Sequence, residues 1–108
     1  MKNVQWKIWT RTNTEKKARE VLSRVLKRMG RQAQVVSVEP CPKINGHVIR
    51  FIIELESDGW NDQIIEAFRI GQRAAAGWSL IGSVIDDPGG WSSSVSDSGV
   101  VAMEWSFR

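Results

Sequence analysis

Hydrophobic and polar residues alternate along the first ten residues of the chain. Large apolar side chains occupy every second position, at Val4, Trp6 and Ile8. A period of two is typical of a β-strand that buries one of its faces. The pattern therefore predicts a first strand over residues 3–10, with Trp9 on the opposite face.

The spacing of apolar residues then changes to three and four, which is the period of an amphipathic helix. The stripe runs from Ala18 to Met29, and basic residues fill most of the remaining positions. Thr12 and Glu15 match a capping box, in which the two residues satisfy free backbone N–H groups of the first turn. We therefore expect a first helix that begins at this capping box and ends at Gly30, a residue type that commonly closes helices.

Two β-branched segments follow this helix and predict a hairpin. The first segment spans residues 34–39 and stops at the two prolines around Cys41, because proline cannot donate to a strand ladder. Asn45 and Gly46 form a common turn dipeptide, and residues 48–56 after them alternate between apolar and polar side chains. These segments are the predicted second and third strands.

The second half of the chain predicts another helix and two more strands. Apolar residues recur at steps of three and four between Trp60 and Trp78, with Gly77 as the expected closing residue. Residues 80–85 are mostly apolar and predict a fourth strand, and residues 101–107 alternate as a fifth strand.

Turn-forming residues separate these last two strands. Glycine, serine, aspartate and proline dominate residues 86–99, a composition typical of loops. We expect one long loop there, and loops of this length are often functional. This loop carries Trp91.

The resulting order of elements is strand, helix, two strands, helix, two strands. Right-handed connections place both helices on one face of an antiparallel sheet and leave the other face open. The sequence thus predicts a single α+β domain over residues 1–108, with a ferredoxin-like βαββαβ fold and an additional C-terminal strand. The expected core combines apolar residues of the helices and strands: Val4, Trp6, Ile8, Leu22, Val25, Leu26, Met29, Val36, Val38, Ile49, Phe51, Ile53, Ile64, Phe68, Ala75, Met103, Trp105 and Phe107.

Composition narrows the classes of protein to consider. The 108 residues are 42% hydrophobic and 25% charged, which is ordinary for one globular domain. Cys41 is the only cysteine and His47, expected to be exposed beside the turn, is the only histidine, so a disulfide and paired-histidine metal sites are excluded. We expect neither a signal peptide nor a membrane helix, because the first residues lack an apolar core and no apolar run approaches roughly 20 residues. We expect a cytoplasmic protein of a bacterium or phage, with no cofactor, bound metal or membrane partner.

The charge is unevenly distributed. Residues 1–31 contain ten basic and two acidic residues, whereas residues 32–108 contain five basic and ten acidic residues. Such asymmetry concerns partners and not the fold. Nucleic-acid binding by the basic first helix is therefore one hypothesis. The side chains that would contact phosphates are Lys16, Lys17, Arg24, Lys27 and Arg28.

Catalytic motifs are weak in this sequence. Asp86 and Asp87, together with Asp58 and Asp62, offer carboxylates for a divalent cation, so a divalent-dependent nuclease is a third hypothesis. Turn formation and helix capping explain the same aspartates more simply. We therefore expect a protein without catalytic residues that is not an enzyme.

Tryptophan is the other unusual feature, with six tryptophans and no tyrosine. Trp9 and Trp91 lie outside the apolar stripes, and exposed tryptophan is enriched at binding hot spots. The hypothesis that we rank first, ahead of nucleic-acid binding and the nuclease, is a non-enzymatic protein-binding module. Such a module could be an immunity-type inhibitor that neutralises a bacterial toxin, or a protein that self-associates. The residues expected at this interface are Trp9, Arg50, Asp86, Asp87, Trp91, Asp97 and Glu104.

Overall fold

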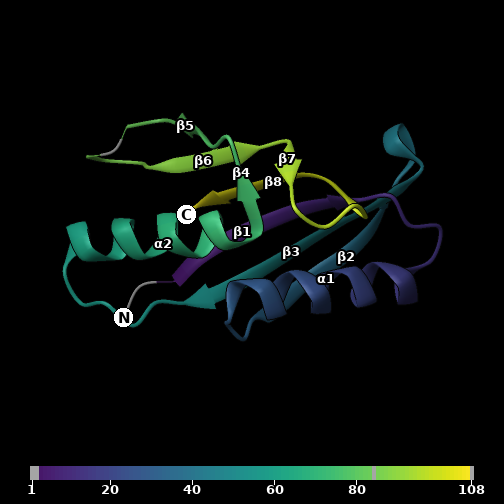
Figure 1. Ribbon diagram of the computed structural model, residues 1–108, viewed down its shortest axis with the longest axis horizontal. Coiled ribbons are helices and arrows are strands. Elements are labelled where there is room, and N and C mark those ends of the chain that lie inside the picture. Colours follow the sequence, from purple (N-terminus) through teal and green to yellow (C-terminus); the bar gives the residue numbers. More distant parts are fainter. Residues whose placement is uncertain (1–2, 84, 108) are drawn as a thin grey trace.

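The computed structural model describes residues 3–83 and 85–107, and within them the protein has two α-helices and an antiparallel sheet of six strands (Figure 1). The strands of this sheet are β1 (Asn3–Thr10), β2 (Gln34–Cys41), β3 (Gly46–Glu54), β5 (Ser79–Ile81), β6 (Gly89–Ser92) and β8 (Val100–Ser106). The helices are α1 (Glu15–Met29), α2 (Trp60–Ala74) and the short 3-10 helix η1 (Pro42–Ile44). A separate two-stranded sheet is formed by β4 (Ala75–Ala76) and β7 (Ser94–Val95).

The strand order in the main sheet is β2-β3-β1-β8-β6-β5, and every neighbouring pair is antiparallel. The predicted α+β class is therefore confirmed. The order is not that of a ferredoxin-like βαββαβ fold with one strand added after it. The strand beside β1 is the C-terminal β8, because the chain turns back after β5 and adds the β5–β6 hairpin at the outer edge.

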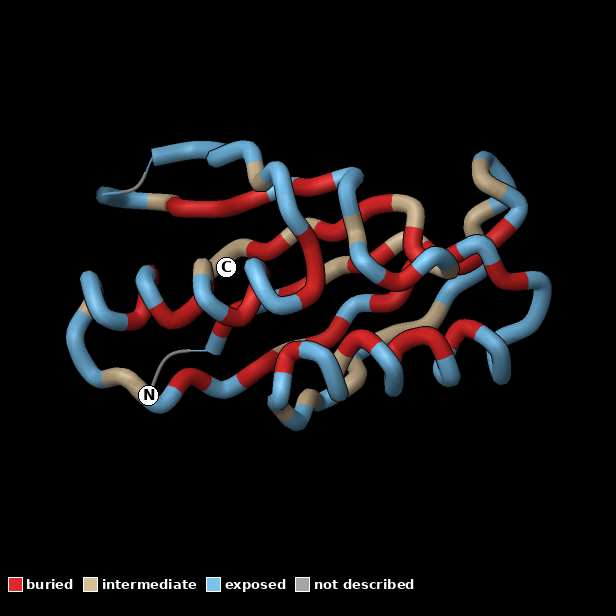
Figure 2. The backbone as a smooth tube through the Cα atoms, in the orientation of Figure 1, coloured by how far each residue is buried: buried red, intermediate tan, exposed pale blue. Residues whose placement is uncertain are grey.

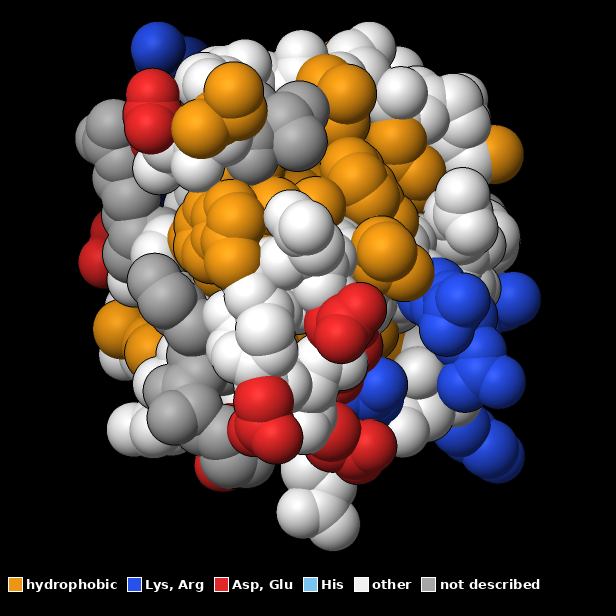
Figure 3. All heavy atoms as spheres, turned by 90° about the vertical axis from the view of Figure 1, so that its left-hand side faces the viewer, with side chains coloured by type: hydrophobic (Ala, Val, Ile, Leu, Met, Phe, Trp, Pro, Cys, Tyr) orange, Lys and Arg blue, Asp and Glu red, His pale blue; other side chains and the backbone are white. Residues whose placement is uncertain are grey.

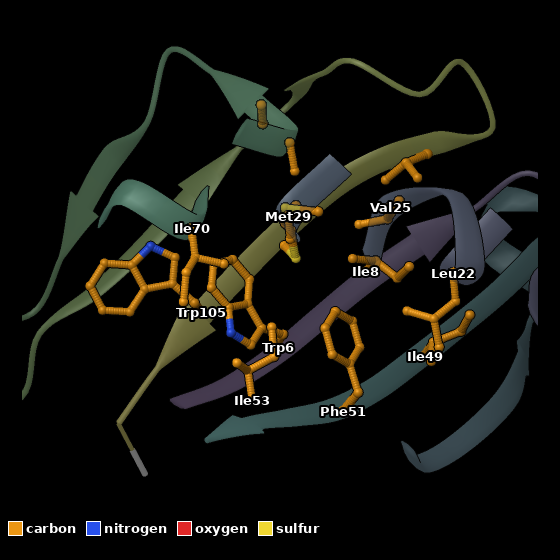
Figure 4. Packing of buried hydrophobic residues seen from close by; sticks show 14 of the residues in the cluster. Trp6, Ile8, Leu22, Val25, Met29, Ile49, Phe51, Ile53, Ile70 and Trp105 are labelled. Carbon is orange, nitrogen blue, oxygen red and sulfur yellow. The ribbon is translucent and has the colours of Figure 1, made fainter. Parts of the chain in front are cut away.

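Both helices cover the same face of the sheet (Figure 1). Buried residues follow the central strands and recur on the inner sides of both helices (Figure 2). Met29 of α1 and Ile70 of α2 gather with Trp6 and Trp105 in one core (Figure 4). The ring of Trp6 lies 6.4 Å from the rings of both Phe51 and Trp105, so aromatic side chains from three adjacent strands fill the centre.

Helix α1 begins two residues later than the capping box predicts. Its N-cap is Thr14, whose Oγ1 accepts a hydrogen bond of 3.2 Å from the backbone N–H of Lys17. Thr12 is buried instead, with its carbonyl oxygen 2.9 Å from Nδ1 of His47. The expectation of an exposed His47 is therefore wrong, because the chain that leaves β1 folds over the start of β3. The predicted end of the helix at Gly30 is confirmed, and this glycine has φ of 69°.

Strand β2 contains a bulge between Val35 and Ser37. One extra residue reverses the alternation of side chains along a strand. Val35 and Val38 therefore pack against the core, whereas Val36 is 58% exposed. The prediction that Val36 is buried was wrong because it assumed a regular strand.

Helix α2 ends at Ala74, before the predicted closing residue Gly77. The chain leaves the helix because Ala75 and Ala76 pair with β7. Trp78 does not continue the helical stripe. Its indole turns back and donates a hydrogen bond of 3.2 Å to the Ala75 carbonyl oxygen.

The segment predicted as one loop over residues 86–99 contains the strands β6 and β7. Strand β6 has no apolar alternation, because two of its four residues are glycines. A Cβ at Gly90 would meet the indole of Trp105, so this position in the sheet has room only for glycine. Neither described α-helix is long and apolar enough to cross a membrane.

Candidate functional site

The sheet face opposite the helices carries four of the seven residues predicted to contact a partner. Trp9, Arg50, Trp91 and Glu104 come from β1, β3, β6 and β8 respectively. On β1, β3 and β8 the sequence neighbours of these residues are buried, so their own side chains project from the opposite face. We call this surface the helix-free face.

Strand register arranges part of this face as a row of side chains. Trp91 is paired with Glu104, Glu104 with Lys7, and Lys7 with Arg50. Directly opposed residues on one sheet face have Cβ atoms about 5 Å apart. The side chains therefore follow each other in the order Trp91, Glu104, Lys7, Arg50, which we call the central row. Lys7 was missed as a site residue, although its position between the buried Trp6 and Ile8 was a usable signal.

The charges of the central row are only weakly paired within the chain. The ammonium nitrogen of Lys7 lies 4.7 Å from the centre of the Trp9 ring, in a cation–π contact. Arg50 Nη1 lies 3.7 Å from Oε2 of Glu39, and both side chains are exposed, so this ion pair contributes little. Glu104 has no ion-pair partner among the described residues. These charges are thus available to another molecule.

A hollow of about 340 Å³ lies in the middle of the helix-free face. Its lining mixes polar and apolar side chains, including Gln5, Lys7, Val36, Arg50, Ile52, Glu104 and Ser106. A neighbouring hollow of about 250 Å³ shares Glu104 and Ser106 and extends to Ile81 and Asp87. The helix-free face therefore carries two adjacent hollows, the first bordered by Arg50 and the second extending to the β5–β6 hairpin.

The β5–β6 turn brings the predicted residues Asp86 and Asp87 to the margin of this face. Asp86 is exposed, and Asp87 is partly buried where it lines the second hollow. Trp91, in the strand that follows the turn, is 38% exposed. The acidic turn and the tryptophan thus lie on the same side of the helix-free face, at the β5–β6 hairpin.

Asp97 lies elsewhere, buried against α1. Its carboxylate accepts hydrogen bonds from Nε and Nη2 of Arg24 at 2.7 and 3.2 Å, and from the backbone N–H of Gly99 at 2.8 Å. The hydrogen bond from Arg24 lowers the pKa of Asp97, although burial opposes it. The Arg24–Asp97 pair therefore holds the segment before β8 onto α1, and the structure does not bring Asp97 to the helix-free face.

Replacing Asp97 with alanine is expected to destabilise the fold by about 1–2 kcal/mol, because the backbone N–H of Gly99 and the guanidinium of Arg24 lose their acceptor. Urea unfolding followed by tryptophan fluorescence measures the change. Asp86→Ala, at an exposed turn position, is the matched control and should stay within about 0.5 kcal/mol of the wild type. Equal midpoints for the two variants would contradict this role of Asp97.

The basic residues of α1 divide into paired and unpaired groups. Arg24 pairs with Asp97, and Arg19 Nε lies 3.1 Å from Oε2 of Glu15. The other predicted phosphate contacts are exposed, without an ion pair among the described residues: Lys16, Lys17, Lys27 and Arg28. The lysines at 16 and 27 are eleven residues apart, close to three turns, so they lie on the same side of the helix. The basic surface of α1 is therefore smaller than the sequence indicates.

Carboxylates are not gathered into a cation site in the part of the chain that the structure describes. No group of three His, Cys, Asp or Glu side chains there is placed to hold a metal ion. Asp62 lies in the first turn of α2, where a carboxylate stabilises the helix dipole. Asp86 and Asp87 lie in the β5–β6 turn. No observation among these residues favours the nuclease hypothesis.

Hydrophobic side chains also gather at the end of the molecule where α2 begins (Figure 3). Trp60 and Phe107 are half-buried, and their ring centres lie 5.2 Å apart. The ring centre of Phe107 lies 5.8 Å from that of the core residue Trp105. Leu80, which shares a register row with Gly90 and Trp105, is 58% exposed on the helix side of the sheet. This apolar end is the exposed margin of the core.

No protein-family model, curated protein or solved structure matches this chain.

Proposed function

We propose that the protein is a non-enzymatic protein-binding module that binds its partner with the helix-free face. The observation that supports this proposal is the central row, in which Trp91, Glu104, Lys7 and Arg50 stand side by side and the last three line the hollow. Tryptophan and arginine dominate hot spots of protein interfaces. Charges of both signs beside them favour one partner over others and fix the orientation of that partner.

The scaffold we propose for this module is a modified ferredoxin-like fold. Strands β2, β3, β1 and β8 with α1 and α2 form two interlocked strand–helix–strand units. The β5–β6 hairpin is then an insertion between α2 and the last strand of these units. It widens the helix-free face and supplies Trp91. An immunity-type inhibitor in a bacterial cytoplasm is one form that this proposal takes.

Nucleic-acid binding by α1 is the second candidate function. It is favoured by the unpaired, exposed Lys16, Lys17, Lys27 and Arg28, which would neutralise phosphates and release counterions. Arg24 does not belong to this set, because Asp97 already binds it. The two candidate functions use different surfaces, so matched variants separate them.

The test compares three baits in affinity capture from a nuclease-treated extract of cells that produce the protein. The baits are the wild type, a face variant with Trp91→Ala and Arg50→Ala, and a helix variant with Lys16→Glu and Lys27→Glu. We expect protein partners that the wild type and the helix variant retain equally, and that the face variant loses by about tenfold or more. All substituted side chains are at least partly exposed, and circular dichroism verifies that each variant is folded.

A gel-shift titration with the same three proteins tests the second candidate. Complexes that weaken steeply with salt and disappear in the helix variant would support nucleic-acid binding by α1. Equal capture by the face variant and the wild type would refute the proposed binding surface.

A further inference from the structure

We propose that the partner of the helix-free face is a second copy of this chain, in a dimer whose two-fold axis runs parallel to the strands between β1 and β8. This inference rests on the proposed function, because it names the occupant of the same surface. It follows from the residues of the face, which are complementary to themselves when the face is turned about that axis.

The two-fold axis lies over the middle of the sheet, between the faces of the two copies. Strands β1 and β8 are the two central strands of the order β2-β3-β1-β8-β6-β5, with two further strands on each side. Rotation about this line lays β8 over β1 of the second copy, β6 over β3, and β5 over β2. All six strands then take part in an aligned packing of two sheets, a common arrangement in β-sandwiches.

The charges of the central row match under this rotation. Glu104 meets Lys7 of the second copy, and Trp91 meets Arg50 of the second copy. The first contact is an ion pair, and the second places a guanidinium on an indole face. Symmetry repeats each contact, so four favourable pairs form from one row.

The sizes of the side chains match in the two adjacent rows. Trp9 is paired across β1 and β8 with Ala102, so rotation places the indole over a small residue. Ile52 of β3 and Gly89 of β6 belong to the other row, and rotation places the isoleucine over the glycine. Large side chains on β1 and β3 thus face small ones on β8 and β6, which permits close approach of the two sheets.

The hollow of about 340 Å³ provides space for the indole of Trp91 of the second copy. It borders Lys7, Arg50 and Ile52, and Trp91 of the second copy arrives above Arg50. A two-fold axis at right angles to the strands would instead place each residue of the row over itself. Lys7 would then meet Lys7, and Arg50 would meet Arg50. Like-charge repulsion therefore selects the axis parallel to the strands.

Sedimentation velocity over a concentration series tests this dimer with charge-reversed variants. The wild type should sediment with twice the chain mass of 12.2 kDa. Glu104→Lys alone places lysine over Lys7, and Lys7→Glu alone places glutamate over Glu104, so each should weaken dimerisation by at least about tenfold. An equimolar mixture of the two variants should restore the dimer, because every interfacial pair in the mixed dimer is again of opposite charge. The double variant should also dimerise, and Lys27→Glu on α1 is the unaffected control.

Restoration by mixing separates a broken contact from a misfolded chain, since it requires both variants to be folded. A wild type that stays monomeric at every concentration, or a mixture that dimerises no better than its components, would overturn the inference. If the wild type is monomeric while the face variant still loses captured proteins, the self-association fails and the proposed binding function stands. If the face variant also captures like the wild type, both fail.

Discussion

Replacing Gly46 with alanine is expected to destabilise the protein by at least about 3 kcal/mol, the largest effect of any substitution considered. Gly46 is the first residue of β3 and follows Asn45, which has φ of 51°. A Cβ at position 46 would collide with the backbone carbonyl of Thr10, the last residue of β1. Main-chain atoms of a central strand cannot rotate away as a side chain can, so β1 and β3 would have to separate at this end.

Urea unfolding of Gly46→Ala measures this cost, with Gly59→Ala as the matched control. Gly59 is the N-cap of α2, has φ of −81°, and a Cβ there meets only Asp62 Oδ2 at 3.9 Å. We expect Gly59→Ala to change the free energy of unfolding by less than about 1 kcal/mol. Similar losses in the two variants would show that the close approach of Gly46 to β1 is not responsible.

Replacing Glu66 with glutamine is expected to cost about 2–3 kcal/mol of stability at neutral pH. Glu66 is a buried residue of α2 whose carboxylate accepts hydrogen bonds from the backbone N–H groups of Glu56 and Ser57, at 3.0 and 2.8 Å, and from Arg31. The carboxylate thus joins α2 to the end of β3 and to the chain after α1. A neutral amide keeps the shape of this side chain but loses the ion pair and half of its acceptor capacity.

The same contacts predict how stability depends on pH. Burial raises the pKa of Glu66, but the hydrogen bonds from Glu56, Arg31 and Ser57 together outweigh it and lower the pKa from 4.5 to about 2. A carboxyl whose pKa is lower in the folded state stabilises the fold at pH values above its unfolded pKa, and this contribution is lost as the pH falls towards 2. The wild type should therefore lose stability between about pH 5 and pH 2.

Unfolding midpoints measured across this pH range test the role of Glu66. The profile of Glu66→Gln should be flatter than that of the wild type, whereas the exposed Glu54→Gln should leave it unchanged. A wild-type slope that persists in Glu66→Gln would assign the acid sensitivity to other carboxylates.

Regular periodicity made the first 74 residues largely predictable. The strands around Trp6 and Phe51 and both helices follow from the spacing of their apolar residues alone. The bulge at Val36 was not predictable, because a one-residue insertion leaves the composition of a strand unchanged. The strand Gly89–Ser92 was not predictable either, since its two glycines have low strand propensity and its pairing with β5 and β8 is not visible in the local sequence.

Only part of the candidate site was predictable, because Lys7 was missed and Asp97 lies against α1. Alternation alone assigns Trp9, Arg50 and Glu104 to the exposed sides of their strands. Their adjacency depends on strand order, and no local pattern indicates that the last strand lies beside the first. The pairing of Asp97 with Arg24 was hidden for the same reason, because these residues are 73 positions apart in the sequence.

The neighbouring positions of β1 and β8 also affect how the chain folds as it is synthesised. Trp6 and Trp105 are opposed in these two strands, so the centre of the sheet closes through a contact between residues made early and late. Until β8 emerges from the ribosome, one edge of β1 lacks its partner strand and the indole of Trp6 lacks part of its cover. Such distant pairing slows folding.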